Sequence, residues 1–231
     1  LVNAAANAGA DAVKFQTFVA EETLTADAPA APYQKKAGFK TQLAMVSQLE
    51  LRPENFRELA EHARTRGLAF LSTPFDLSSL EFLVELGVPA LKISSGDLTY
   101  SALLTAAAQA GRPVILSTGM ATLEEVSTAV DTLQDAGLKD LVLLQCTSVY
   151  HAPEETINLR AMNTLANVFQ VPVGLSDHSL GIEVSLGAVA LGASVIEKHL
   201  TLDHNLKGPD HKASLEPHEL SALVSGVRRL E

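Results

Sequence analysis

Short apolar runs alternate with longer amphipathic stretches along most of this chain. The runs hold four to six residues and are rich in Val, Ile, Leu and Phe, which is typical of strands buried on both faces. Strands that alternate with helices predict βα units and a parallel sheet. The seven expected strands lie at residues 12–16, 69–72, 90–93, 114–117, 141–146, 173–176 and 195–198.

Between these runs, apolar residues recur at helical spacing, and most such stretches stop just before a glycine. In one of them Phe56, Leu59 and Ala60 share a face, and Gly67 follows the end. Glycine readily adopts the left-handed conformation that ends a helix. The expected helices lie at residues 1–9, 53–66, 78–86, 101–110, 123–136, 181–191 and 217–230.

The repeated order of helix, glycine and strand predicts an α/β fold, a TIM (β/α)8 barrel. Such a barrel needs eight strands, so we expect its first strand to be missing from the chain, just before Leu1. A doubly wound open sheet is the alternative, but it should carry a glycine-rich turn after its first strand, and none follows Gln16. Instead a long segment, residues 17–40, follows and contains Ala31-Pro-Tyr-Gln34; loops of this length are more often functional than idle.

Composition narrows the functional classes. The 231 residues, 47% of them hydrophobic, are enough to form the core of a single catalytic barrel domain over residues 1–231. A net charge of −10 argues against non-specific binding to nucleic acid or anionic membranes. No apolar run approaches the roughly 18 residues of a membrane span. Cys146 is the single cysteine and cannot form an internal disulfide, so we expect a cytoplasmic protein.

Polar or ionisable residues follow every expected strand, and in a (β/α)8 barrel the chemistry gathers at these ends. Lys14 and Lys92 stand out because a lysine within an apolar strand is rarely buried without a partner. Two such lysines can face one anion. The hydroxyls and close backbone N–H groups of Ser95-Gly96 and Thr118-Gly119 suit a phosphate or a carboxylate. Helix capping is the alternative role for Thr118 and Ser179.

Two of the strands end at histidines, His178 and His199, which lie 21 residues apart. This spacing suits the ends of consecutive strands joined by a helix. Neutral imidazole is a common metal ligand, and the neighbouring carboxylates, Asp177 and Glu197, can orient the rings. With two protein ligands evident, water and substrate would complete the shell, which favours labile Mn²⁺ or Mg²⁺ over structural zinc. Purely structural histidines are the alternative.

A compact segment, Lys207-Gly-Pro-Asp-His211, follows the last expected strand. It is either a solvated turn or a loop that covers a ligand and carries Asp210. Most histidines outside the strand ends, such as His151 and His204, are expected at the surface.

Taken in order, the motifs resemble those of the sialic acid synthase family, which includes N-acylneuraminate synthases and their legionaminate, pseudaminate and spore-coat polysaccharide relatives. The matching segments cover nearly the whole chain: ADAVKFQTF, APYQ, FLSTPFD, LKISSGD, VILSTGMAT, LLQCTSVY, GLSDHSLG, VIEKHLT and GPDHKASLEP. The resemblance implies condensation of phosphoenolpyruvate with an N-acylated amino-hexose, N-acetylmannosamine-like, to give a nonulosonic acid and phosphate. It also implies a homodimer.

The resemblance also implies roles for single residues. His178 and His199 match the ligands of the divalent metal, and Asp97, Asp210 and Lys92 are the candidate catalytic residues. In the family the metal polarises the sugar aldehyde, C3 of phosphoenolpyruvate attacks it, water adds at C2, and phosphate leaves. The candidate substrate-binding residues are Lys14, Gln16, Thr73, Ser95, Ser117, Ser148, Tyr150 and Ser176.

The chain departs from the family pattern in places. The first strand, with its catalytic glutamate and N-H-x-G stretch, is not found, nor is the C-terminal antifreeze-like domain that supplies an arginine to the partner subunit. His151 follows Tyr150 where proline is common. Two alternatives to the synthase stay open: a barrel aldolase that uses Lys92 or Lys14 as a Schiff base, and a non-catalytic module that binds sugar phosphates.

Overall fold

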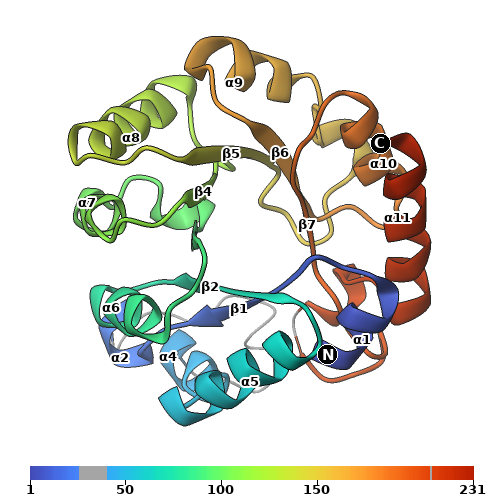
Figure 1. Cartoon of the computed structure of the whole chain (residues 1–231), viewed down its shortest axis with the longest axis horizontal. Coiled ribbons are helices and arrows are strands. Elements are labelled where there is room, and N and C mark those ends of the chain that lie inside the picture. The colour runs from blue at the N-terminus through green and yellow to red at the C-terminus, as the bar shows by residue number, and fades with distance from the viewer. Residues whose placement is uncertain (26–40, 209) are drawn as a thin grey trace.

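The computed structural model of the protein describes residues 1–25, 41–208 and 210–231. Within these residues, strands and helices alternate, and the helices lie outside a curled layer of strands (Figure 1). The segment Ala31–Gln34, which the sequence singled out, lies outside the described residues. No helix in the described ranges is long and apolar enough to cross a membrane.

All seven expected strands are present, with ends within two residues of those expected. Every ladder is parallel and joins strands that are consecutive in the chain: β1 pairs with β2, and β3 to β7 pair in order. β2 and β3 also lie next to each other, so the strands curl into a half-barrel (Figure 1). The strands are β1 Ala12–Thr17, β2 Ala69–Pro74, β3 Leu91–Ile93, β4 Val114–Ser117, β5 Leu141–Cys146, β6 Val173–Asp177 and β7 Ile196–Lys198.

The expected helices are also present, and within the described residues the structure adds three that the pattern did not predict. Those expected are α1 Val2–Ala8, α5 Pro53–Thr65, α6 Leu77–Leu86, α7 Ser101–Gln109, α8 Leu123–Asp135, α10 Glu183–Ala190 and α11 Pro217–Leu230. The additions are α2 Ala20–Thr23, α4 Gln42–Val46 and α9 Ala161–Phe169. Helix α9 is followed by Gln170, whose φ of 54° is left-handed. In α6 a glycine, Gly87, takes this position. The sequence around α9 therefore lacks the glycine that marks the end of other helices.

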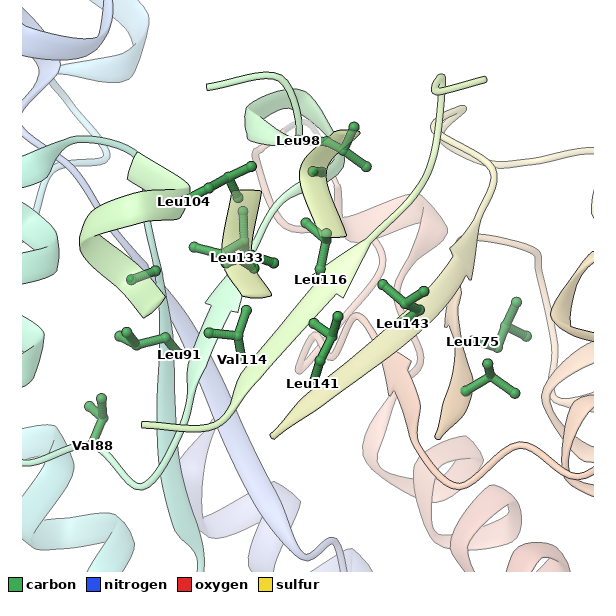
Figure 2. Close-up of a cluster of buried hydrophobic side chains, with 14 of the residues drawn as sticks. Val88, Leu91, Leu98, Leu104, Val114, Leu116, Leu133, Leu141, Leu143 and Leu175 are labelled. Atoms are coloured by element: carbon green, nitrogen blue, oxygen red, sulfur yellow. The ribbon is translucent and has the colours of Figure 1, made fainter. Parts of the chain in front are cut away.

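Alternation along the strands separates a packed outer side from a polar inner side. Leu91, Val114 and Leu116 point toward the helices and form one cluster with Leu104 of α7 and Leu133 of α8 (Figure 2). Because successive strand residues face opposite sides, the residues between them face the interior of the half-barrel. The apolar cluster therefore fixes which strand-end groups point into the candidate site.

A buried ion pair ties β6 to β7 on the outer side. Asp177 and Lys198 are register partners, and their Oδ2 and Nζ atoms are 2.8 Å apart. Ser179 donates its N–H and hydroxyl to Asp177 Oδ1, and Ser185 of α10 donates its hydroxyl to Oδ2. Burial raises the pKa of Asp177, but Lys198 and the two hydroxyls lower it below its usual range. Its contribution to stability is thus full above the unfolded pKa of about 3.9 and is lost as the pH falls through the lower folded value.

Replacing Lys198 with methionine should lower the free energy of unfolding by about 3–5 kcal/mol, because Asp177 stays buried without its counter-charge. Urea denaturation followed by circular dichroism measures the loss. Arg64→Met, which breaks the exposed pair with Glu61, is the matched control and should leave the midpoint unchanged. A Lys198→Met midpoint equal to that of the wild type would show that the pair does not stabilise the fold.

Candidate active site

Side chains from β1, β3 and β6 meet at Glu197 on β7. Lys14 of β1 places its Nζ 3.4 Å from Oε2 of Glu197, and Lys92 of β3 places its Nζ 3.9 Å from Oε1. Ser176 of β6 donates a hydrogen bond of 2.9 Å to Oε1. Burial raises the pKa of Glu197, but the two lysines outweigh it and lower that pKa to about 2. The carboxylate is therefore charged at any physiological pH.

Lys92 is the buried lysine that the sequence predicted, and it does have partners. Its side chain is 3% exposed, and its Nζ donates to Ser117 Oγ at 2.6 Å and to Ile93 O at 2.8 Å. Burial lowers the pKa of Lys92 to about 8, although Glu197 opposes this shift. The ammonium form therefore still predominates at neutral pH.

Gly119, two residues after the end of β4, packs closely against two serine hydroxyls. Its N–H donates to Ser95 Oγ at 2.9 Å. A Cβ at position 119 would collide with Ser148 Oγ and would come within 2.9 Å of Ser95 Oγ. Only glycine lets these two hydroxyls and a backbone N–H converge, which is the kind of group that binds anionic oxygens.

Thr73 of β2 has an unsatisfied hydroxyl. The residue is 1% exposed, and its Oγ1 has no hydrogen-bond partner among the described residues. Thr73 and Gln16 are register partners, so alternation places both on the inner face with Lys14. A buried hydroxyl left unpaired costs about 1–3 kcal/mol, so a ligand that accepts its hydrogen bond would gain from binding here.

The two strand-end histidines lie close together, with Tyr150 against both. The ring centres of His178 and His199 are 5.5 Å apart, and the Tyr150 ring centre is 4.2 Å from His178 and 5.5 Å from His199. His178 donates from Nδ1 to Thr147 O at 2.8 Å, which leaves Nε2 free to accept or to bind a metal. Burial lowers the pKa of His199 to about 4, so this ring is neutral at physiological pH.

The expectation that Asp177 orients His178 is wrong. Asp177 faces the outer side and bonds Lys198, while the carbonyl of Thr147 holds the ring of His178. The capping roles considered for Thr118 and Ser179 are also wrong. Thr118 Oγ1 donates to Leu144 O, and the hydroxyl of Ser179 donates to Asp177.

The remaining candidates border these groups. Ser94 donates to Asp97 Oδ2 at 2.5 Å, and burial raises the pKa of Asp97 even though Ser94 and Lys92 lower it. Burial raises the pKa of the Tyr150 phenol, and the nearby charge of Asp210 raises it further. Gln16 is exposed at the end of β1.

The sequence reasoning missed two residues that connect the lysines, the serine hydroxyls and the histidines. Glu197 was counted only as a neighbour of His199, yet alternation puts positions 197 and 199 on one face. Cys146 lies between Ser148 and the histidines, since its Sγ is 3.8 Å from both Ser148 Oγ and His178 Nδ1. Gly119 was named for its backbone N–H, but its close contacts with Ser95 and Ser148 became visible only in the structure.

The two histidines offer nitrogen ligands that can be compared with the needs of a metal ion. Over the ranges that the structure describes, no three His, Cys, Asp or Glu side chains form a ready-made cage. Two imidazoles with ring centres 5.5 Å apart, one with Nε2 available, fit an ion that keeps other positions open for water or substrate. A closed structural site does not fit.

A cavity of about 570 Å³ lies elsewhere, between α1 and α11, and its lining includes Asn3, Asn7 and His218. It gathers no cluster of charged groups. The strand ends are thus the better candidate for chemistry.

Comparisons with known proteins place the chain as a whole in a family. The NeuB family profile matches residues 1–231. N,N'-diacetyllegionaminic acid synthase from Campylobacter jejuni is 49% identical over 100% of this chain and 70% of its own length. N-acetylneuraminate-9-phosphate synthase from Homo sapiens is 38% identical over 100% of this chain and 65% of its own. The chain thus spans about two thirds of the length of these curated relatives.

A solved structure gives the same result in three dimensions. The N-acetylneuraminic acid (sialic acid) synthetase from Leptospira borgpetersenii, in complex with citrate, has a TM-score of 0.90 and 40% identity. The match covers 99% of this chain and 76% of that one. Sequence and fold therefore lead to one conclusion: the chain belongs to the NeuB family, and its relatives include synthases of sialic and legionaminic acids.

Proposed function

We propose that this chain forms the catalytic barrel of a nonulosonic acid synthase. The reaction condenses phosphoenolpyruvate with an N-acylated amino-hexose and releases phosphate. The observation that carries the proposal is the convergence of Lys14 and Lys92 on one charged carboxylate, close to the paired histidines. The names of the relatives support the product class.

Phosphoenolpyruvate would bind at the lysine end of the site. Its carboxylate and phosphate carry several negative charges, which two ammonium groups can offset. The unpaired hydroxyl of Thr73 would donate to one of its oxygens. The other proposed contacts are Ser95, Ser117, Ser148 and Ser176.

His178 and His199 would hold a divalent cation, Mn²⁺ or Mg²⁺. When bound there, the cation would supply Lewis acidity to the sugar carbonyl. The neutral ring of His199 and the fixed tautomer of His178 suit this role. Tyr150 packs against both rings and, with Gln16, would contact the sugar.

With the two substrates bound in this way, the proposed reaction makes one carbon–carbon bond and breaks the bond to phosphate. C3 of phosphoenolpyruvate forms a bond to the aldehyde carbon of the sugar, and the carbonyl oxygen takes a proton. Water adds to C2 and loses a proton, and the C–O bond to phosphate then breaks. Asp97, whose carboxyl pKa is raised, and Asp210 are the proposed groups for proton transfer. Lys92 would stabilise negative charge on the reacting phosphoenolpyruvate.

The closed (β/α)8 barrel also stays a proposal. Among the described residues no ladder joins β7 to β1, and an eighth strand there would pair both edges and close a (β/α)8 barrel. The homodimer and the cytoplasmic location stay predictions from the sequence.

A Schiff-base aldolase is the second candidate, favoured by the lowered pKa of Lys92. Against it, Ser117 and Ile93 hold the ammonium by two short hydrogen bonds. Borohydride with a carbonyl substrate would trap an imine on Lys92 only if the aldolase mechanism operates.

Full-length enzyme should release phosphate from phosphoenolpyruvate only when Mn²⁺ or Mg²⁺ and a suitable sugar are both present. A phosphate assay over N-acyl mannosamine, glucosamine and diamino-deoxy-hexose derivatives measures this. Turnover that resists EDTA and ends on borohydride treatment would refute the synthase in favour of the aldolase. Sugar binding in calorimetry without phosphate release from any substrate would support a non-catalytic module.

The double variant His178→Ala, His199→Ala should lose Mn²⁺ binding and at least about 100-fold of the turnover, because both protein ligands are gone. Electron paramagnetic resonance of free Mn²⁺ measures binding without relying on activity. His151→Ala, which removes an exposed histidine of the neighbouring loop, is the matched control and should bind Mn²⁺ normally. Retained Mn²⁺ affinity in a folded double variant would overturn the metal assignment.

A further inference from the structure

Glu197 has no part in the proposed chemistry, yet it occupies the centre of the lysine pair. Its two carboxylate oxygens have different surroundings. Oε1 accepts a hydrogen bond from Ser176 and is the oxygen nearer to Lys92, whereas Oε2 faces Lys14. The Ser176 bond holds one side of the carboxylate and leaves the other side for Lys14.

The two lysines are not equally available to a ligand. Lys92 has two short hydrogen bonds to Ser117 and Ile93 that do not depend on Glu197. Within the described part of the chain, Lys14 makes a single polar contact, the ion pair with Glu197 at 3.4 Å. This contact is longer than a normal hydrogen bond. Lys14 is therefore the ammonium that an incoming anion can most readily take over.

We propose that Glu197 is an internal counter-ion that competes with the anionic substrate, and with the departing phosphate, for the ammonium of Lys14. This role rests on the proposed function, because it assumes that the lysine pair is the anion-binding site. Glu197 thereby sets how tightly anions are held and how readily phosphate leaves.

The competition follows from charge and from hydrogen-bonding capacity. A carboxylate and a phosphate are both anions, and the ionised oxygens of each are acceptors that cannot donate to the other. Two like charges within a few Å, in a partly buried site, repel by an amount worth at least about tenfold in affinity. When phosphate departs, the renewed pairing of Lys14 with Glu197 offsets the contact that is lost. A pocket of two lysines without this carboxylate would hold its product too strongly.

The opposite role makes a different prediction. Glu197 also favours the charged form of Lys92, whose pKa burial lowers to about 8. If that support were its main effect, removing the carboxylate would weaken anion binding. The direction of the change in affinity therefore decides between the two roles.

Calorimetry of full-length enzyme with inorganic phosphate, without sugar, at about pH 6.5, tests the proposal. This pH lies below the pKa of about 8 of Lys92. Glu197→Gln keeps the shape and an acceptor for Ser176, and it should bind phosphate about tenfold more tightly. Glu124→Gln changes the net charge equally on the exposed start of α8 and should have no effect. In steady-state assays Glu197→Gln should show stronger product inhibition by phosphate and a lower kcat.

Unchanged or weaker phosphate binding in folded Glu197→Gln overturns the proposal. Glu197→Ser is the second variant, for use if the glutamine variant does not fold. Lys14→Met should abolish the gain when combined with Glu197→Gln, because the competition acts through Lys14. Weak phosphate binding that Lys14→Met does not reduce would instead refute the anion site itself, and the proposed function with it.

Discussion

Two ammonium groups inside a curled sheet require a negative charge, and Glu197 supplies it. An unpaired buried charge is among the most costly features a fold can carry. Here one carboxylate contacts lysines from β1 and β3 while it sits on β7, the far end of the strand order. The contact is possible only because the strands curl until their two ends face each other (Figure 1). Fold and site therefore depend on the same interaction.

Alternation on β6 and β7 gives the two faces different tasks. The outer face carries the buried pair of Asp177 and Lys198, which joins the strand ends to α10. The inner face carries Glu197 at the level of Ser176, followed by His178 and His199. A fixed outer pair keeps the inner groups in register, so the anion end and the imidazole end of the site keep their relative positions.

Much of this was predictable, and the failures have physical reasons. The strands were found because buried parallel strands are continuous apolar runs, and most helices were found because glycine ends them. Helix α9 was missed because Gln170 takes the left-handed conformation instead. The lysines and histidines were found because charged or metal-binding groups at strand ends are unusual. Asp177 was misjudged because proximity in sequence to His178 was given more weight than the opposite direction of its side chain. Glu197 was overlooked because its partners lie on strands that only the curl of the sheet brings near.

The most direct test is a crystal structure of the full-length enzyme with phosphoenolpyruvate and Mn²⁺. We expect the anionic groups of phosphoenolpyruvate within hydrogen-bond reach of Lys14 and Lys92, with the hydroxyl of Thr73 donating to one of their oxygens. We also expect the Mn²⁺ ion between His178 and His199. Phosphoenolpyruvate bound away from the lysines, or a covalent link between Lys92 and a substrate carbon, would contradict the proposed function.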